Sequence, residues 1–308
     1  MSITKRLRKD NALYSLVLDA RNIVLRFQYY LRGQKNIIRR NYKSIFGTDI
    51  NFDNPQTLNE KIQWLKVYDN KKIYSVWADK YGCRDYIRKE FGEDYLVPLL
   101  FKTRKVSDIN SKNINVFPCV IKANHSSGDW MILKKAEDVD WNELRIKCRE
   151  WLKNDFHIRS EEKQYKTIKR YIIVEKLLVN KNGKIPNDYK LHFINGKLAF
   201  IYCSIDREGS NKRQIYDINW NVLPFSYDGK KNPIISTPLI EKPKTFDDML
   251  RIGTHFANVL SYVRVDFYDV DGKLYCGEIT LHHGNGYDRF NPPEYDLIYG
   301  KQLVLPKK

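Results

Sequence analysis

The sequence predicts an α+β sandwich protein preceded by a basic helical segment. Three observations indicate this class: the order helix, strand, loop, helix, strand in the first half of the chain, two β-hairpin signals in the second half, and an amphipathic basic stretch at the start. A chain of 308 residues with 42% hydrophobic and 13% aromatic side chains can bury one large core or two to three small ones. No apolar run approaches the roughly 20 residues needed to cross a bilayer, so we expect no membrane span.

The first 45 residues are strongly basic and amphipathic. They hold eleven Lys and Arg residues against Asp10 and Asp19, which is +9 of a total net charge of +17. Apolar side chains recur there on one face at helical spacing: Leu13, Leu16, Val17, Ala20, Val24, Phe27 and Leu31. Two interpretations stay open, a helix that packs on its own domain with a solvated basic back, and a helix that attaches to an anionic membrane surface. Because Asp19 and Arg21 end the short apolar stretch early, we do not expect a cleaved signal peptide.

The five cysteines are scattered, odd in number and without a CxxC pair. This pattern favours reduced thiols in the cytosol over a disulfide framework or a zinc knuckle.

Capping and strand signals place the elements of the first half. Thr57, followed three residues later by Glu60, is a capping box that predicts a helix after the Asn54-Pro55 turn. A second helix should end near Gly92, followed by a short strand that enters Pro98. Residues 140–156 read as a further helix, and residues 171–179 as a buried strand.

A lysine follows a β-rich run in the middle of the chain. Residues 116–121 predict a strand that ends at Lys122, just before a small-residue turn that contains Ser126, Ser127 and Gly128. An ammonium beside a pliable loop can bind phosphate, and an ordinary surface hairpin explains the same pattern.

Two hairpin turns organise the second half. Asn195-Gly196 and Asp271-Gly272 each separate two alternating runs. The second hairpin places Asp266 and Glu278 on paired strands, where two carboxylates repel unless a positive charge lies between them. Magnesium is the natural ion for such oxygen ligands. A solvent-facing pair is the alternative, but Asp266 lies between Val265 and Phe267, in a strand too apolar for full exposure.

Five segments, taken in their order along the chain, resemble the successive nucleotide-binding elements of the ATP-grasp superfamily. They are more similar to its TupA-like branch, which occurs among bacterial polysaccharide-biosynthesis proteins that are often labelled glycosyltransferases. The resemblance runs from about residue 45 to the end and rests on five segments: ADKYGCRDYIRKEFGEDYLVP, FPCVIKANHSSG, YIIVEKLL, DYKLHFINGK and RVDFYDVDGKLYCGEIT. NPQTLNEKIQWLK and GEIT are the stretches most particular to that branch.

The resemblance implies a division of the chain. It predicts an ATP-grasp fold, in which two α+β subdomains sandwich the nucleotide. Residues 1–45 would be the basic helical segment, 46–75 a helical lead-in, 76–170 the small subdomain and 171–308 the large subdomain with the magnesium site. The usual N-terminal substrate domain of the superfamily has no room here, so acceptor recognition must be built differently.

The resemblance also implies roles for residues. ATP would be bound by the phosphate-binding Lys80 and Lys122, the flap His125, Ser126, Ser127 and Gly128, and the adenine-reading hinge Glu175, Lys176 and Leu177. Asp188, Lys190, Arg207 and Arg213 would lie beside the transferred phosphoryl group and the anionic substrate. Asp266, Glu278 and Thr280 would bind Mg²⁺, with Thr280 in a position where the superfamily commonly has Asn. His282 and His283, with the glycine-rich bend after them, would face the substrate.

The implied activity is ATP- and Mg²⁺-dependent ligation of a carboxylate to an amine through an acyl phosphate. The acceptor would be an anionic glycan or sugar acid, and the donor an amine or amino acid, on a capsule or O-antigen precursor. We expect a cytoplasmic protein, with peripheral attachment at the inner membrane face as the alternative role of the N-terminal helix. A metal-dependent glycosyltransferase is the runner-up because Asp269-Val270-Asp271 spells an Asp-x-Asp motif, although a hairpin turn explains it better. Nucleic-acid binding is not expected, because the aromatics are not interleaved with the basic run.

Overall fold

The computed structural model describes residues 11–227 and 236–307 and divides into two compact units. Unit 1 combines Met1–Ile37, Asp79–Gly82 and Pro98–Leu177, and unit 2 combines Ile38–Ala78, Cys83–Val97 and Leu178–Lys308. The units interleave along the chain, and the division into four segments drawn from the sequence stays a prediction. No helix in the described ranges is both long enough and apolar enough to span a membrane.

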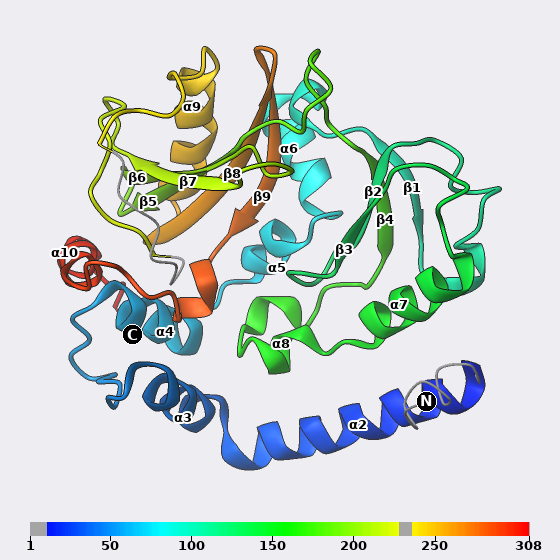
Figure 1. Ribbon diagram of the computed structural model, residues 1–308. Helices are drawn as coiled ribbons and strands as arrows, with labels where there is room; N and C mark the ends of the chain where they lie inside the picture. The colour runs from blue at the N-terminus through cyan, green and yellow to red at the C-terminus, as the bar shows by residue number, and fades with distance from the viewer. Residues whose placement is uncertain (1–10, 228–235, 308) are drawn as a thin grey trace. The chain divides into compact units, whose positions relative to one another are not determined.

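Unit 1 is an antiparallel sheet covered by helices (Figure 1). The strand order is β1-β4-β2-β3, with β1 (Leu99–Thr103), β2 (Cys119–Ala123), β3 (Trp130–Leu133) and β4 (Ile172–Lys176). Its helices are α2 (Asn11–Arg32), α7 (Trp141–Lys153) and α8 (Phe156–Arg159), with short 3₁₀ turns η2 (Val106–Asp108) and η3 (Lys163–Tyr165). Leu144 and Cys148 of α7 pack against the buried side chains of Ile121 and Val174, which forms a small core on one face of the sheet.

Unit 2 is built on a five-stranded antiparallel sheet in the order β7-β6-β5-β8-β9. The strands are β5 (Asp188–Ile194), β6 (Lys197–Ile205), β7 (Lys212–Tyr216), β8 (Tyr262–Val270) and β9 (Lys273–Thr280). The helices are α4 (Leu58–Tyr68), α5 (Lys72–Ala78), α6 (Cys83–Phe91), α9 (Phe246–Ala257) and α10 (Glu294–Gln302), with η1 (Glu93–Tyr95) and η4 (His283–Gly286); α3 (Gln34–Phe46) begins in unit 1 and continues into unit 2.

Helix α9 covers one face of this sheet. Phe193 of β5 and Val265 of β8 point into the core that α9 completes. A Cβ atom at Gly253 would lie 2.3 Å from the Phe193 ring, so this position needs glycine for the close approach of helix and sheet. On the opposite face, Ile194 of β5 and Tyr262 of β8 join a second core with residues of α4 and α10, and most of the remaining positions of these two strands carry polar side chains.

The local signals in the sequence are confirmed. Thr57 caps α4, and Thr57 and Glu60 form both bonds of the capping box. The β8–β9 turn has Asp271 and Gly272 at φ 51° and 87°, and Asn195 and Gly196 have similar values, as two-residue hairpin turns with two left-handed positions require. All five cysteines are buried free thiols.

Two strands begin later in the sequence than predicted. The strand that was expected to enter Pro98 begins after it, at Leu99, and the run from Val116 becomes a strand only at Cys119, after Pro118. Proline cannot donate to a sheet ladder, which places each strand on the far side of its proline. The small-residue turn links β2 to the antiparallel β3 as a hairpin, and its part in phosphate binding stays a prediction.

Candidate active site

A row of charged side chains lies on the face of the unit 2 sheet opposite α9, beside the second core. Residues alternate between faces along a strand, so Asp188, Lys190 and His192 of β5 share one side while Leu191 and Phe193 reach the core. In the antiparallel register Lys190 lies opposite Asp266, and His192 opposite Arg264. Two neighbouring central strands therefore bring acidic and basic groups together.

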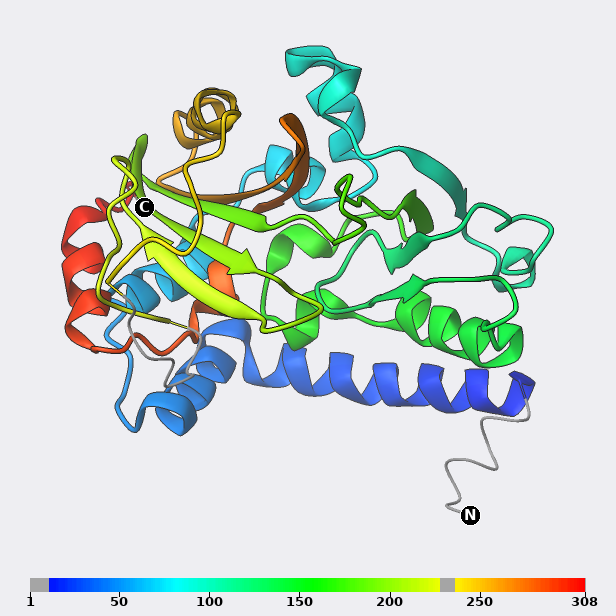
Figure 2. The ribbon, with the colours of Figure 1, turned by 45° about the horizontal axis from the view of Figure 1, so that its top comes forward.

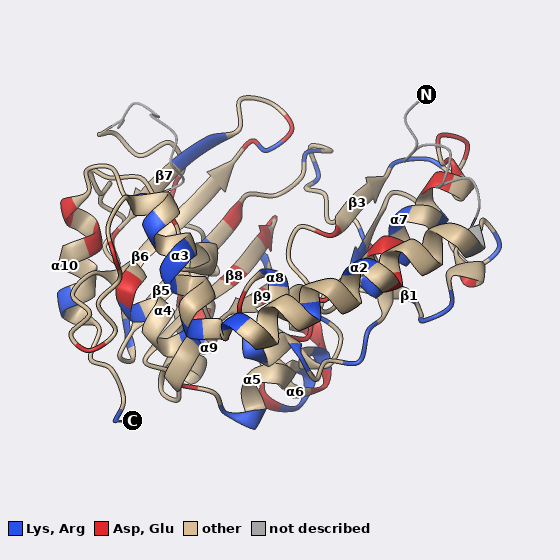
Figure 3. Cartoon of the chain, turned by 90° about the horizontal axis from the view of Figure 1, so that it is seen from below, with Lys and Arg blue, Asp and Glu red and all other residues tan. Residues whose placement is uncertain are grey.

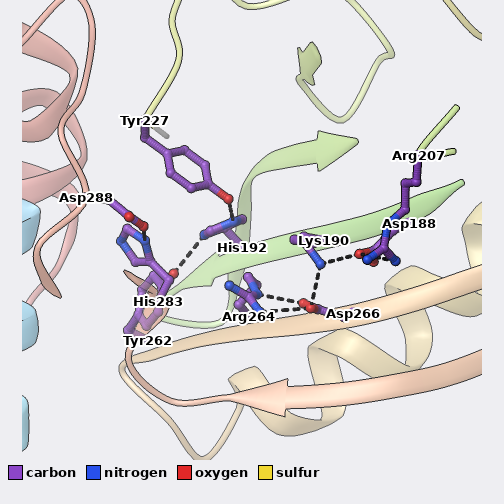
Figure 4. A network of polar contacts seen from close by, with 10 residues as sticks. All are labelled: Asp188, Lys190, His192, Arg207, Tyr227, Tyr262, Arg264, Asp266, His283 and Asp288. Carbon is purple, nitrogen blue, oxygen red and sulfur yellow. Dashed lines mark hydrogen bonds and ion pairs between the residues drawn. The ribbon is translucent and has the colours of Figure 1, made fainter. Parts of the chain in front are cut away.

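The charged groups form a continuous ion network (Figure 4). Lys190 Nζ lies 2.5 Å from Asp188 Oδ2 and 2.9 Å from Asp266 Oδ2. Arg264 binds the same Asp266 carboxylate with two nitrogens, Nε to Oδ1 at 2.6 Å and Nη2 to Oδ2 at 2.8 Å. Arg207, in the turn after β6, places Nη1 3.7 Å from Asp188 Oδ2. The network thus joins two carboxylates to three cations.

Burial and charge fix the protonation states of this network. Burial alone would raise the pKa of Asp266, but the charges of Arg264 and Lys190 outweigh it and hold that pKa below its ordinary value. For Lys190, burial would lower the pKa, and the charges of Asp188 and Asp266 raise it instead. Asp266 is therefore an anion and Lys190 a cation at neutral pH.

The positive charges beside Asp266 correct an expectation from the sequence. Opposed carboxylates were expected to repel and to need a metal between them, whereas Arg264 and Lys190 already compensate Asp266. Arg264 was not among the residues selected from the sequence. The signal was present, because Arg264 lies two residues before Asp266 and the period of a strand puts both on one face.

Asp266, Glu278 and Thr280, the metal ligands predicted from the sequence, fit a magnesium ion. Glu278 lies directly opposite Asp266 in the β8–β9 register, and Thr280 lies two residues further along β9. Thr280 Oγ1 and Asp188 Oδ1 are buried and have no hydrogen-bond partner in the part of the chain that the structure describes. Within residues 11–227 and 236–307 no three His, Cys, Asp or Glu side chains are grouped so as to hold a metal by themselves. Two carboxylates and a hydroxyl suit Mg²⁺, which usually keeps waters or substrate phosphates as its other ligands.

A second polar network continues from His192 away from the ion network. His192 Nδ1 lies 2.7 Å from the Tyr262 hydroxyl and its Nε2 lies 3.0 Å from the Tyr227 hydroxyl. Burial and the nearby His283, Arg264 and Lys190 hold the pKa of His192 well below its ordinary value, so the ring is neutral. It therefore accepts a hydrogen bond from one tyrosine and donates one to the other.

His283 belongs to this interior rather than to a substrate surface. Its ring is fully buried and packs against Tyr227, Tyr262 and His192, and its Nδ1 lies 2.9 Å from Asp288 Oδ2. The sequence-based expectation that His283 faces substrate is therefore wrong for this structure. His282 is also buried, at 6% exposure.

Helix α4 fixes the loop that follows Thr280. Gln63 Nε2 donates to the carbonyls of Asn285 and Gly286 at 2.9 Å, and Lys66 Nζ lies 2.7 Å from Asn285 Oδ1. Lys66 is only 1% exposed, so its ammonium replaces water contacts with these oxygens. The segment NPQTLNEKIQWLK thus supports the end of GEITLHHGNG.

In unit 1 the predicted phosphate-binding lysines already have partners. Lys122 Nζ of β2 lies 2.6 Å from Glu175 Oε2 of β4, and Lys80 Nζ donates to the Ser126 carbonyl at 2.7 Å. Both ammonium groups can make further hydrogen bonds, since a lysine has three N–H donors. Of the expected flap, His125 and Ser126 are buried, while Ser127 and Gly128 are exposed.

The hinge and Arg213 are less available than the sequence implied. The N–H of Lys176 donates to the Pro98 carbonyl at 3.0 Å and that of Leu177 to the Pro118 carbonyl at 3.2 Å. An adenine edge at this hinge would have to displace one of these bonds or bind through other groups. Arg213 Nη1 donates to Asn211 Oδ1 at 2.5 Å in its own turn. The structure therefore groups Asp188, Lys190 and Arg207 but turns Arg213 to the β6–β7 connection.

Comparison with known protein families identifies the fold. A model of the TupA-like ATP-grasp family matches residues 60–304, which is most of the chain. The chain belongs to the TupA-like ATP-grasp family. This confirms the resemblance and the mixed helix-and-sheet fold that the sequence predicted.

Solved ATP-grasp ligases resemble this chain at low sequence identity. D-Alanine–D-alanine ligase from Bacillus anthracis complexed with ATP is 16% identical, with a TM-score of 0.40 over 67% of this chain and 54% of that one. D-Alanine–D-alanine ligase from Helicobacter pylori is 15% identical, with a TM-score of 0.39 over 80% and 69% of the two chains. The ATP-grasp ligase PsnB, complexed with a phosphomimetic variant of a minimal precursor, Mg and ADP, is 13% identical, with a TM-score of 0.37 over 79% and 67%.

This member of the TupA-like family spans about half the length of the first of these ligases. No curated protein sequence matches it significantly.

Proposed function

We propose that this protein is an ATP- and Mg²⁺-dependent carboxylate–amine ligase that works through an acyl phosphate. Membership of the ATP-grasp family supports ATP-dependent ligation. The observation that favours it most is the row of Asp188, Lys190, Asp266 and Arg264 on the face of the unit 2 sheet opposite α9, because phosphoryl transfer needs cations that are already oriented.

In the proposed reaction, a carboxylate oxygen of the acceptor attacks the γ-phosphorus of ATP, and the bond to ADP breaks. The amine of the donor then attacks the carbonyl carbon of the acyl phosphate, and inorganic phosphate leaves as the amide forms. Neither step needs a protein nucleophile. The contribution of the chain is to position the reactants and neutralise charge.

Lys190 and Arg264 are the cations that suit the transferring phosphoryl group. Asp188 and Asp266 hold the Lys190 ammonium at 2.5 and 2.9 Å, so its charge is fixed in place before substrate arrives. Arg264 is bound through two nitrogens to Asp266 and keeps further N–H donors. Arg207, more exposed and 3.7 Å from Asp188, suits an anionic group of the acceptor.

Unit 1 would bind the nucleotide. Lys80 and Lys122 would contact the phosphates, and the exposed Ser127 and Gly128 would offer backbone N–H groups. Asp266, Glu278 and Thr280 would hold Mg²⁺, which would supply positive charge that offsets the charge of the phosphates.

For the substrates we propose a sugar acid or amino acid of a bacterial surface polysaccharide precursor as acceptor, and an amine or amino acid as donor. The membership of a TupA-like family supports this class, and the net charge of +17 suits an anionic glycan. A cytoplasmic location follows from the need for ATP and agrees with five free thiols.

The glycosyltransferase alternative rests on Asp269-Val270-Asp271, and the structure gives these carboxylates other partners. Asp269 Oδ1 accepts the Gly272 N–H at 2.7 Å, and Asp271 Oδ2 accepts the Lys181 N–H at 2.7 Å. Asp269 therefore stabilises the β8–β9 turn, and Asp271 links this turn to the loop that contains Lys181.

The deciding experiment incubates the purified protein with ATP, Mg²⁺, candidate sugar acids and amines. A ligase of this kind releases ADP only when an acid is present, and hydroxylamine in place of the amine yields a hydroxamate. An isotope-labelled carboxyl oxygen of the acid should appear in the released phosphate, because that oxygen bonds to phosphorus in the acyl phosphate.

Two results would contradict the proposal. AMP as product would indicate an adenylate route, and consumption of a nucleotide sugar without ATP would establish the transferase. A Lys190→Met variant that folds normally and releases ADP at the full rate would remove Lys190 from the reaction.

A further inference from the structure

Helix α2 meets its own unit with the face opposite to its apolar stripe. Tyr14, Leu18 and Asn22 of α2 are buried, at 8%, 3% and 6% exposure. The helix runs along α7 and α8 of the same unit (Figure 2). The stripe predicted from the sequence points the other way. Every residue of that stripe is exposed: Leu13, Leu16, Val17, Ala20, Val24, Phe27 and Leu31.

Polar contacts fasten the docked face. Arg26 Nε lies 2.6 Å from Asp155 Oδ2, and Arg170 Nη2 lies 2.5 Å from the other oxygen of the same buried carboxylate. Asn22 Nδ2 donates to the Lys153 carbonyl at 2.6 Å, and Tyr14 donates to Glu150. The helix is thus held without using its apolar stripe.

The exposed stripe is unusually apolar for a protein surface. Leu16 is 64% exposed, Phe27 65% and Leu31 71%, and Ile23 and Tyr30 extend the same face. The stripe runs along a 22-residue helix, which is about 33 Å long. Contiguous apolar patches of this kind mark interaction sites, whereas single exposed apolar residues do not.

We propose that this face of α2 lies in the interfacial region of an anionic membrane, parallel to the lipid surface. The apolar side chains would enter the headgroup and acyl boundary, while Arg21 and Arg32 beside the stripe contact anionic headgroups. In Figure 3 the ribbon of α2 is mostly uncharged, with isolated basic positions. One face of α2 therefore binds the protein, and the other is left for lipid.

Charge favours lipid over a second copy of the chain. The first 45 residues bear a net charge of +9, so two such segments placed face to face would repel, whereas an anionic surface attracts each of them. Asp19, the acidic residue of α2, lies 2.5 Å from Lys153 and so adds little repulsion toward lipid.

The test uses the full chain and sedimentation with lipid vesicles, without ATP or substrate, so that its failure leaves the ligase proposal untouched. Vesicles of phosphatidylcholine and phosphatidylglycerol, about two to one, should bind the protein at low salt, and pure phosphatidylcholine should bind it weakly. Raising the salt from about 0.1 M to about 1 M shortens the screening length from about 10 Å to about 3 Å and should release part of the protein.

Substitutions on α2 and matched substitutions elsewhere on the surface make the test specific. Phe27→Ser should weaken vesicle binding about tenfold or more, because an inserted ring is lost, and Arg21→Gln about fivefold. Both positions are exposed, so the fold should melt as in the wild type. Ile218→Ser and Val304→Ser, which replace apolar residues at 49% and 68% exposure in unit 2, should bind vesicles like the wild type.

The proposal is overturned by equal binding to neutral and anionic vesicles, by no binding to either, or by full binding of Phe27→Ser. Sedimentation velocity without vesicles tests the remaining possibility, that a second copy of the chain covers the stripe. A dimer that Phe27→Ser dissociates would assign the stripe to a second copy and would also overturn the proposal.

Discussion

Replacing Asp266 by Asn in the protein without nucleotide or metal should lower its stability. If Asp266 and Glu278 only repelled each other, removing one charge would raise the melting temperature. In the structure Asp266 is 4% exposed and compensates Arg264 and Lys190, both of which are largely buried. Its neutralisation leaves these cations without their counter-charge, so the sign of the effect reverses.

The contacts also set the magnitude. Removing one partner of a buried ion pair costs about 3–5 kcal/mol, and the Asn oxygen still accepts one bond from Arg264, so we expect the lower end, about 3 kcal/mol. At about 2–4 °C per kcal/mol for a chain of this size, Tm should fall by about 6–12 °C. Lys190 keeps Asp188 at 2.5 Å, which limits the loss.

Thermal unfolding followed by circular dichroism at pH 7 with EDTA measures this shift. Asp271→Asn removes an exposed charge from the same hairpin but keeps a side-chain oxygen that can accept the Lys181 N–H, so it should change stability by less than about 0.5 kcal/mol. Because the folded-state pKa of Asp266 is depressed, its contribution is present above the unfolded carboxyl value and is lost as pH falls through the folded value. The gap between wild type and variant should therefore close in acid. An unchanged or higher Tm for Asp266→Asn at pH 7 would refute the reasoning.

Three further predictions concern other parts of the molecule. ATP with Mg²⁺ at one hundred times its dissociation constant should stabilise the fold by about 2.7 kcal/mol, more than ATP alone, and Glu278→Gln should abolish that difference in a thermal-shift assay. Burial lowers the pKa of His125 from 6.5 to about 4, so its contribution is present above pH 6.5; between pH 7 and pH 4.5 wild type should lose about 2.4 kcal/mol more than His125→Gln in urea unfolding. Thr57→Ala removes the acceptor for the Glu60 N–H and should cost about 1 kcal/mol, with Thr57→Ser retaining most of the stability.

Features set by neighbouring residues could be predicted from the sequence. The capping box of α4 and the turn at Asp271-Gly272 each depend on side chains and dihedrals within a few positions, and both occur as expected. The turn then fixes the β8–β9 register, which is why Asp266 and Glu278 could be paired in advance.

Features that depend on residues distant in the sequence could not be predicted. Lys190 meets Asp266 across 76 positions of sequence, and Gln63 reaches Asn285 across 222, so no local pattern announces either contact. The two histidines after Thr280 look chemically active in a sequence, yet His283 is enclosed by aromatic rings from three separate segments. Asp266 was identified as a ligand, while the arginine that compensates its charge was overlooked.

Helix α2 shows why an amphipathic pattern does not reveal which face meets the protein. The spacing of Leu16, Val24 and Phe27 predicts a helix with an apolar stripe, and it is equally compatible with a core or a lipid surface on the other side. The choice is made by Asp155, a buried carboxylate 129 positions from Arg26, which draws the polar side of α2 inward. Paired ions at such a site hold a helix in one orientation, because turning it would leave a buried charge without a partner. The docked side of α2 thus combines the buried Leu18 with specific polar contacts, and this leaves the apolar stripe on the exposed side of the helix.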